Sequence, residues 1–158
     1  MHEIRPARET DIPGLLRLLT QVNLVHHFGR PDLFRGPATK YSQQELETML
    51  RTPGDTAIFV AEDPQGEVAG HAFCILKETA GDSILKDMKT LYIDDICVDE
   101  SCRGKGVGRA LYQYVRSYAR SLGCYNLTLN VWACNPAALR FYESCGMQTQ
   151  KIGMETIL

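Results

Sequence analysis

Apolar residues along the chain follow two patterns, one typical of strands and one typical of helices. Runs rich in β-branched or alternating apolar residues predict strands at 3–6, 56–62, 67–77, 91–98 and 125–133. Apolar residues at helical spacing predict helices at 12–22, 43–51, 107–122 and 136–145. Residues 147–158 have the composition for one or two short final strands. This order of elements predicts an α/β fold with a mixed sheet, in one domain that spans 1–158.

Capping residues and glycines mark the ends of several predicted helices. Thr10 is placed to cap the first helix, and Ser42 with Glu45 forms a capping box before the second. Gly123 and Gly146 follow the last two helices, as glycines at helix C-termini do. From 23 to 41 the helical pattern stops, and two glycines with two prolines predict a long loop of the kind that often covers a binding site.

The stretch from Leu91 to Leu122 combines a strand, a glycine-rich turn and a helix N-terminus. Glycines let the backbone approach an anion closely, and the unpaired N–H groups at a helix start carry partial positive charge. Arg103, Lys105 and Arg109 add full positive charges around the same turn. The sequence therefore predicts a site for a phosphate-bearing cofactor between 103 and 109.

The spacing of the glycines separates three kinds of phosphate loop. A P-loop requires a serine or threonine after its lysine, whereas Gly106 follows Lys105. A dinucleotide fingerprint requires a third glycine at the position that Arg109 occupies. The pattern that remains is R-x-x-G-x-G over 103–108, after a strand that ends in Val-Asp.

This pattern resembles the pyrophosphate loop of the acetyl-CoA-dependent GNAT N-acetyltransferase superfamily. Two further segments fit the same superfamily in the same order: the strand 91–98 with its acidic pair, and 135–146 with Phe141-Tyr142. Within the superfamily, the chain is most similar to the diamine (spermidine/spermine) acetyltransferases. The resemblance implies the GNAT fold, a mostly antiparallel sheet of six to seven strands flanked by about four helices. It also implies a homodimer.

The resemblance further implies which residues meet acetyl-CoA. Backbone groups of the strand are expected to pair with the pantetheine amides, as a peptide adds to a sheet, and the turn is expected to bind the diphosphate. The expected cofactor-binding residues are Ile96, Cys97, Val98, Arg103, Gly104, Lys105, Gly106, Val107, Gly108, Arg109, Asn135 and Ala138. No metal site is expected, because the six cysteines contain no C-x-x-C pair and no histidine partners at zinc spacing.

Two side chains are candidates for proton transfer. By resemblance, Tyr142 faces the CoA sulfur and acts as its acid, although helical spacing also permits a core tyrosine. Asp94 is the candidate base, because a protonated amine must lose a proton before it attacks; binding of a cationic acceptor without proton transfer is the alternative. Strand alternation predicts that Asp94 and Asp95 point to opposite faces. Cys97 suits an apolar strand position, which favours direct attack in a ternary complex over an acyl-enzyme.

The acceptor is expected to be a small-molecule or peptide primary amine, cationic rather than anionic. The expected acceptor-binding residues are His26, Asp32, Phe34, Asp94 and Asn130. Polyamine, amino acid, aminoglycoside, peptide N-terminus and lysine side chain all fit this description. A non-catalytic acetyl-CoA sensor is the rival interpretation, although it has no use for Tyr142 or Asp94. A nicotinamide dehydrogenase is disfavoured by the missing third glycine.

Composition limits the setting in which the protein works. A formal net charge of −2 argues against a general affinity for nucleic acid or anionic membranes. No apolar run approaches the ~20 residues that cross a bilayer, and the polar N-terminal stretch lacks the apolar segment of a secretion signal. Because several of the six cysteines sit inside apolar patterns, a reduced cytoplasmic protein is expected.

Overall fold

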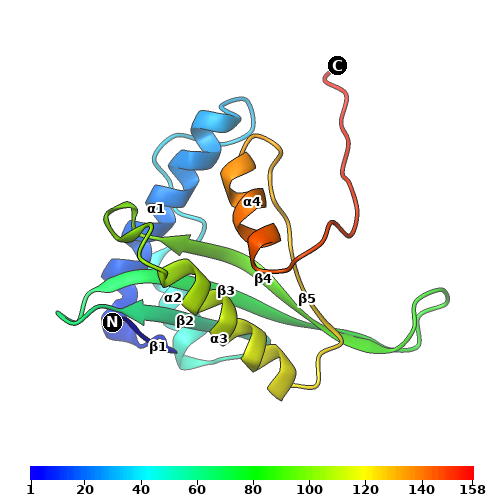
Figure 1. Cartoon of the computed structure of the whole chain (residues 1–158), viewed down its shortest axis with the longest axis horizontal. Helices are drawn as coiled ribbons and strands as arrows, with labels where there is room; N and C mark the ends of the chain where they lie inside the picture. The colour runs from blue at the N-terminus through cyan, green and yellow to red at the C-terminus, as the bar shows by residue number, and fades with distance from the viewer.

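The computed structural model describes all residues from 1 to 158 and contains one five-stranded sheet (Figure 1). Its strands lie in sequence order: β1 (Glu3–Pro6), β2 (Thr56–Glu62), β3 (Val68–Thr79), β4 (Met88–Val98) and β5 (Asn126–Leu129). The first four strands pair antiparallel, and β5 pairs parallel to β4. The predicted α/β fold with a mixed, mostly antiparallel sheet is confirmed, with five strands in place of the six or seven expected.

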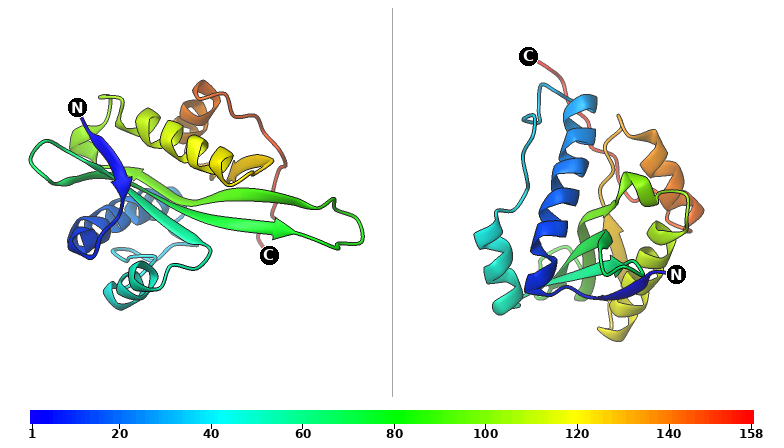
Figure 2. Two further views of the ribbon diagram at one scale, coloured as in Figure 1. Left: turned by 90° about the horizontal axis from the view of Figure 1, so that it is seen from below. Right: turned by 90° about the vertical axis from the view of Figure 1, so that its left-hand side faces the viewer.

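Two helices cover each face of the sheet. Seen along the plane of the sheet, α1 (Ile12–Gly29) and α2 (Gln43–Arg51) lie on one side, and α3 (Val107–Ser121) and α4 (Pro136–Ser144) lie on the other (Figure 2). The core is accordingly divided into two clusters. On one face, α1 and α2 pack against Phe73 of β3, and on the other α3 packs against Ala72 and Cys74 of the same strand. None of the helices combines the length and apolar character that crossing a bilayer requires.

Local sequence signals explain some helix ends and miss others. The capping box of α2 is confirmed, because Glu45 N–H donates to Ser42 Oγ (3.1 Å) and Ser42 N–H donates to Glu45 Oε2 (2.7 Å). The glycines at 123 and 146 are also confirmed as helix ends, with φ of 73° and 94°. Thr10 does not cap α1, because a short 3-10 turn (Glu9–Asp11) precedes that helix.

The predicted loop from 23 to 41 begins too early. Helix α1 continues to Gly29, since residues 23–28 contain neither proline nor glycine and can extend the helix. Only the segment from 30 to 42 forms the connection to α2. As a result, His26 lies on the last turn of a helix rather than on a mobile lid.

The predicted strands in 147–158 do not form. This segment is extended and lies outside the sheet (Figure 1), where Glu155 pairs with Arg30 at the end of α1, and no backbone hydrogen bond joins residues 148–158 to the sheet. Residues 147–158 therefore have the composition of a strand, but no other strand of the chain pairs with them. Strand β5 is also shorter than predicted and ends at Leu129 rather than Ala133.

Two irregularities of β4 leave backbone groups and side chains available for a binding site. Pairing between β4 and β5 ends at Ile93 and Leu129, so residues 94–98 have an unpaired edge on that side while β3 pairs the other. A β-bulge also interrupts the β3–β4 register, because Phe73 faces Asp95 and Cys74 faces Ile93, which leaves Asp94 as the extra residue. The free edge offers backbone N–H and C=O groups, and the bulge redirects side chains.

Candidate active site

The glycine-rich turn connects β4 to the start of α3 and adopts the geometry of an anion cradle. Gly104 and Gly106 have φ of 75° and 83°, in the left-handed region, and Gly106 is the residue that caps α3. A Cβ atom at either position would meet no heavy atom within 4 Å, so the outer side of the turn is open. The first N–H group of α3 that has a backbone acceptor is that of Ala110, so the N–H groups before it remain available, as the predicted phosphate site requires.

Three cations surround this turn and are held by weak contacts to the backbone. Arg103 Nε donates to the Val98 carbonyl (3.3 Å), Lys105 Nζ donates to the Ser101 carbonyl (3.1 Å), and Arg109 contacts Ser144 at the end of α4. None of the three forms an ion pair with a carboxylate. Their charges therefore remain available to a phosphate group, which fits the predicted role.

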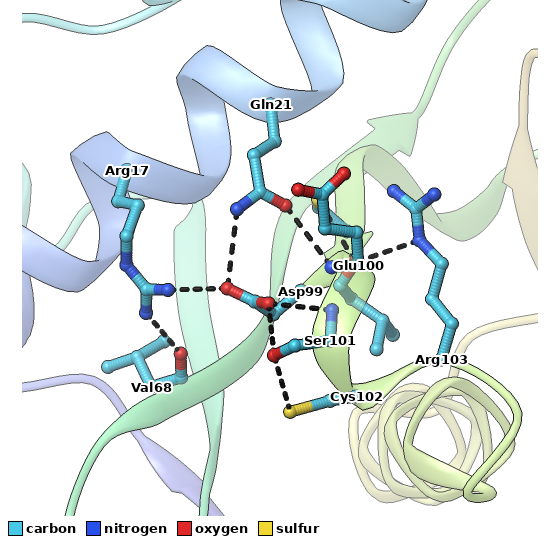
Figure 3. Close-up of polar contacts among 10 residues, drawn as sticks. Arg17, Gln21, Val68, Asp99, Glu100, Ser101, Cys102 and Arg103 are labelled. Carbon is cyan, nitrogen blue, oxygen red and sulfur yellow. Dashed lines mark hydrogen bonds and ion pairs between the residues drawn. The ribbon is translucent and has the colours of Figure 1, made fainter.

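Asp99, the residue after β4, anchors the turn to helix α1 (Figure 3). Its carboxylate accepts hydrogen bonds from Arg17 and from Gln21 Nε2 (3.3 Å) on α1, and from Ser101 N–H (2.9 Å) and Oγ–H (2.7 Å) within the turn. Arg17 also donates to the Val68 carbonyl (2.7 Å). These contacts hold the start of the phosphate turn in one position relative to α1. Sequence reasoning missed Arg17 and Gln21, although their i, i+4 spacing on a polar face was a weak signal.

The Asp99 anchor predicts a pH-dependent contribution to stability. Hydrogen bonds from Ser101, followed by those from Gln21 and the charge of Arg17, lower the pKa of Asp99 below its ordinary 3.8. Because the folded state prefers the carboxylate, the stabilisation is complete above about pH 4 and is lost as the pH falls through the folded-state pKa. Asp99→Asn is expected to lower the free energy of unfolding at pH 7 by about 2 kcal/mol, in urea titrations, and to have a smaller effect at pH 3.

The same substitution is expected to weaken acetyl-CoA binding, because the turn would lose its attachment to α1. Asp82→Asn is the matched control: it removes the same charge from the β3–β4 hairpin, where Asp82 only accepts from backbone N–H groups of Ile84 and Leu85. An Asp99→Asn protein with unchanged stability at pH 7 would show that the anchor is not structural.

A cavity of about 110 Å³ lies where β4 and β5 separate, between the end of α1 and helix α4. Its walls come from α1, β4, the segment around β5 and α4. The lining residues are Val22, His26, Ile93, Asp94, Asp95, Ile96, Leu129, Asn130, Val131, Trp132, Asn135, Ala138 and Tyr142. Most of the predicted site residues outside the phosphate turn therefore meet in one place, next to the free edge of β4.

Helix α4 presents Tyr142 to this cavity. Asn135 caps the helix, because its Oδ1 accepts from Ala138 N–H (3.2 Å), and Pro136 occupies the first position. Burial raises the pKa of the Tyr142 phenol well above its usual 10, and the negative charge of Asp95 acts in the same direction. Tyr142 therefore keeps its proton at neutral pH, as an acid must.

The two aspartates of β4 point to the same face, so the prediction from strand alternation is wrong. Asp94 accepts hydrogen bonds from Tyr41 Oη and from Lys40 Nζ (2.9 Å), whereas Asp95 bonds to Nε2 of His71 on β3. Both Tyr41 and His71 pack against Phe73, which faces α1 and α2. The bulge at Asp94 is the physical reason, because one extra residue reverses the alternation of the strand.

Of the other predicted acceptor-binding residues, some lie at the cavity and one does not. His26 lines the cavity, Phe34 contacts its ring (centroids 5.0 Å apart), and Asn130 donates to Tyr92 Oη (3.2 Å) beside them. Burial lowers the pKa of His26, so its imidazole is neutral at pH 7. Asp32 lies elsewhere, because its carboxylate pairs with Arg30 near the end of α1.

Trp132 completes an aromatic wall that sequence reasoning did not anticipate. Its ring stands edge-on to Phe34, with centroids 5.2 Å apart, and it also lines the cavity. Cys97 contributes only its backbone, since its side chain is buried in the core on the α1 face. Burial raises the pKa of the Cys97 thiol to about 12, so it remains protonated and is a poor nucleophile.

Comparisons with known proteins agree with this geometry. The model of the Acetyltransferase (GNAT) family matches residues 24–147. The chain is similar to a protein of Drosophila melanogaster called probable glucosamine 6-phosphate N-acetyltransferase, with 28% identity over 91% of this chain and 59% of that protein. It is also similar to glucosamine 6-phosphate N-acetyltransferase 1 of rice, with 28% identity over 97% of this chain and 85% of that one.

Solved structures give the same picture of the fold. A variant of the BH1408 protein from Bacillus halodurans superposes with a TM-score of 0.93 at 31% identity, over 99% of both chains. Glucosamine-6-phosphate N-acetyltransferase from Arabidopsis thaliana shares the fold, with a TM-score of 0.72 at 24% identity over 99% of this chain and 98% of that one. The named relatives correct the expected likeness to diamine acetyltransferases, because they are glucosamine 6-phosphate enzymes. The family match covers most of the residues that build the phosphate turn, the free strand edge and the cavity, and the chain belongs to the GNAT family of acetyltransferases.

Proposed function

We propose that residues 1–158 form one N-acetyltransferase domain that transfers the acetyl group of acetyl-CoA to a primary amine. One observation carries this proposal: the open glycine turn follows directly after the free edge of β4, and the same edge lines the cavity that Tyr142 faces. A phosphate cradle, a peptide-like binding edge and an acid at a small cavity are the parts that acyl transfer from a CoA thioester needs. The family membership supports the same reaction class.

The donor is expected to lie along the edge of β4. Its diphosphate would meet the N–H groups at the start of α3 and the cations Arg103, Lys105 and Arg109, and its pantetheine amides would pair with the backbone at 96–98. Asn135 and Ala138 at the start of α4 form the opposite wall. In this proposal the thioester lies in the cavity, where Tyr142 supplies the proton that the leaving sulfur takes. A backbone N–H at the free edge supplies the oxyanion donor.

The acceptor is proposed to be a small cationic amine, or the amine of an amino acid or peptide. Asp94 and Asp95 both reach the cavity, and the aromatic wall of His26, Phe34 and Trp132 closes one side. Carboxylates and aromatic faces both favour an ammonium group. The protonated thiol of Cys97 supports direct attack by the amine in a ternary complex rather than an acyl-enzyme.

Thiol release from acetyl-CoA across a panel of amines tests this function. The panel contains glucosamine 6-phosphate, spermidine, an aminoglycoside, a free amino acid and a short peptide with a lysine. Glucosamine 6-phosphate belongs in the panel because the relatives carry its name, and because Lys40, which pairs with Asp94 of the cavity, is a cation suited to its phosphate. Release well above background with one amine class supports the proposal. Tight donor binding without any release would favour a sensor instead.

We also propose a homodimer, formed by the segment 147–158 of one copy against a second copy. The chain exposes 10109 Å², whereas a monomer of 17.7 kDa is expected to expose about 7,900 Å². The excess is of the size that an obligate dimer buries. The segment carries largely exposed apolar side chains at Ile152, Met154, Ile157 and Leu158.

The surface that this segment would meet is the open edge of β5. That strand pairs only with β4, and a groove of about 380 Å³ runs beside it, lined by Asn126, Leu127 and Met147 among others. An unpaired edge next to an extended apolar segment favours strand addition between two copies. None of the six cysteines forms a disulfide, which is compatible with the cytoplasmic setting that we propose for the dimer.

Substitution within the segment tests the dimer. Light scattering after size exclusion is expected to give the wild-type protein twice the chain mass of 17.7 kDa. Ile152→Glu with Met154→Glu is expected to raise the dimer dissociation constant at least about tenfold, because two buried apolar side chains would become charged. Lys151→Glu changes the charge of the same segment without removing an apolar contact and serves as control. A wild-type protein that is monomeric at all concentrations would contradict the proposal.

A further inference from the structure

A buried histidine–carboxylate pair lies at the cavity, and the reaction described above gives its histidine no role. Nε2 of His71 on β3 bonds to Oδ2 of Asp95 on β4. His71 is completely buried, and only 8% of the Asp95 side chain is exposed. Nδ1 of His71 is the one buried side-chain nitrogen or oxygen in the chain that has no hydrogen-bond partner. A buried polar atom without a partner lowers the stability of the folded state, so its presence here calls for a functional explanation.

Asp95 faces the cavity from below and is surrounded by groups from several elements. Its charge acts on His26 of α1, Tyr41 of the connection before α2, Cys97 of its own strand and Tyr142 of α4. Asp94 is its neighbour in the bulge, and His71 is its partner on β3. Both aspartates line the cavity, and of the two it is Asp95 whose charge acts on the Tyr142 phenol.

The two aspartates differ in how many of their carboxylate oxygens already accept hydrogen bonds. Both oxygens of Asp94 are engaged, one by the Tyr41 hydroxyl and the other by the Lys40 ammonium. Asp95 uses only Oδ2, and its Oδ1 accepts no hydrogen bond within the chain and retains contact with solvent. Asp94 is therefore occupied by a cation, whereas Asp95 has an oxygen available to a proton from the acceptor.

We propose that Asp95 is the catalytic base and that His71 is the positioning residue that holds it, while Asp94, held by Tyr41 and Lys40, only shapes the acceptor site. This inference rests on the proposed acetyltransferase function. The acceptor R–NH₃⁺ gives one proton to Asp95 Oδ1 and becomes R–NH₂. Its nitrogen then forms a bond to the thioester carbon, and the C–S bond breaks. Tyr142 gives its proton to the departing sulfur and becomes a phenolate, the second proton lost by the nitrogen restores the Tyr142 phenol, and Asp95 returns its proton to solvent.

His71 holds Asp95 by donating Nε2–H to Oδ2, which leaves Oδ1 directed at the cavity. In this tautomer Nδ1 carries no proton, so the unpartnered buried nitrogen is an acceptor rather than an N–H donor. Because the imidazole is fully buried against Phe73 (ring centroids 5.0 Å apart), the carboxylate has one fixed orientation rather than several.

The protonation state of the acceptor separates a base from a merely structural residue. For an aliphatic amine, which is protonated at pH 7, Asp95→Asn is expected to lower kcat about 100-fold or more with little change in the KM of acetyl-CoA. For hydroxylamine, which is largely unprotonated at pH 7 and needs no base to become a nucleophile, the loss is expected to be at least tenfold smaller. The loss with the aliphatic amine is also expected to shrink as the pH rises toward 10.

Matched variants complete the test. Asp94→Asn is expected to raise the KM of the aliphatic amine more than it lowers kcat. The ratio of kcat with the aliphatic amine to kcat with hydroxylamine is expected to stay as in the wild type. His71→Leu is expected to lower kcat in the same acceptor-dependent way, and His71→Gln, which keeps an N–H donor, is expected to recover part of it. If His71→Leu does not fold, His71→Gln and Asp95→Asn carry the test.

Binding of acetyl-CoA, measured by calorimetry on each variant, keeps this inference separate from the proposed function. A wild-type protein that neither binds acetyl-CoA nor releases thiol with any amine overturns the function itself. Suppose instead that the wild-type enzyme is active and that Asp95→Asn still binds acetyl-CoA. If this variant then loses activity equally toward both acceptors, or keeps full activity toward both, only the role of Asp95 is overturned.

Discussion

Tyr142→Phe is expected to lower kcat about 100-fold or more while the dissociation constant of acetyl-CoA stays within twofold of wild type. The phenol lines the cavity, and burial keeps it protonated, so its removal deprives the leaving thiolate of an acid without removing a wall of the site. Its hydroxyl forms no hydrogen bond within the chain, and stability is therefore expected to change little. Steady-state thiol release and calorimetry on the same preparation measure both quantities.

Tyr112→Phe is the control for that experiment. Tyr112 is a buried tyrosine of α3 whose pKa burial also raises, but it lines the groove beside β5 rather than the cavity. Its substitution is expected to leave kcat unchanged. Equal turnover by Tyr142→Phe and wild type would reject the acid role and leave Tyr142 as a packing residue of α4.

Gly106→Val is expected to weaken acetyl-CoA binding about 100-fold. At φ of 83° a β-branched residue is strongly disfavoured, so the turn would change conformation and redirect the N–H groups at the start of α3. Loss of two charge-assisted hydrogen bonds to the diphosphate, at about 1.5 kcal/mol each, corresponds to that factor. Titration calorimetry at fixed ionic strength measures the change.

Gly66→Val separates backbone strain from loss of the phosphate site. Gly66 has φ of 86° in the turn between β2 and β3, and, as at Gly106, a Cβ atom there would meet nothing within 4 Å. Both variants are expected to lose similar stability, but only Gly106→Val is expected to lose affinity. Equal affinities in the two variants would mean that the turn does not hold the cofactor.

Local signals explain the parts of the structure that the sequence predicted well. The capping box at Ser42, the glycines that end α3 and α4, and the phosphate turn at 103–108 each depend on residues within a few positions of one another. Helix α4 was also predicted, because Asn135 is a clear N-cap and Pro136 occupies the first position. In these cases the chemistry and the backbone geometry are encoded by the same few residues.

The parts that were missed depend on contacts between distant segments. The bulge that turns Asp94 and Asp95 to one face arises from the register between β3 and β4, and the sequence of β4 alone does not predict it. The Asp99 anchor joins residues 82 positions apart, and the His71–Asp95 pair joins two strands. The segment 147–158 has strand-like composition, but composition alone does not provide the partner that a strand needs.

Calorimetric titration of the wild-type protein with acetyl-CoA tests the central claim most directly, because every assigned role depends on the donor lying on the turn at 103–109 and along β4. We expect saturable binding of one acetyl-CoA per chain, with a dissociation constant in the range of about 1 μM to 1 mM and weaker affinity at high salt. The absence of binding heat and of a thermal shift at millimolar acetyl-CoA would contradict the account.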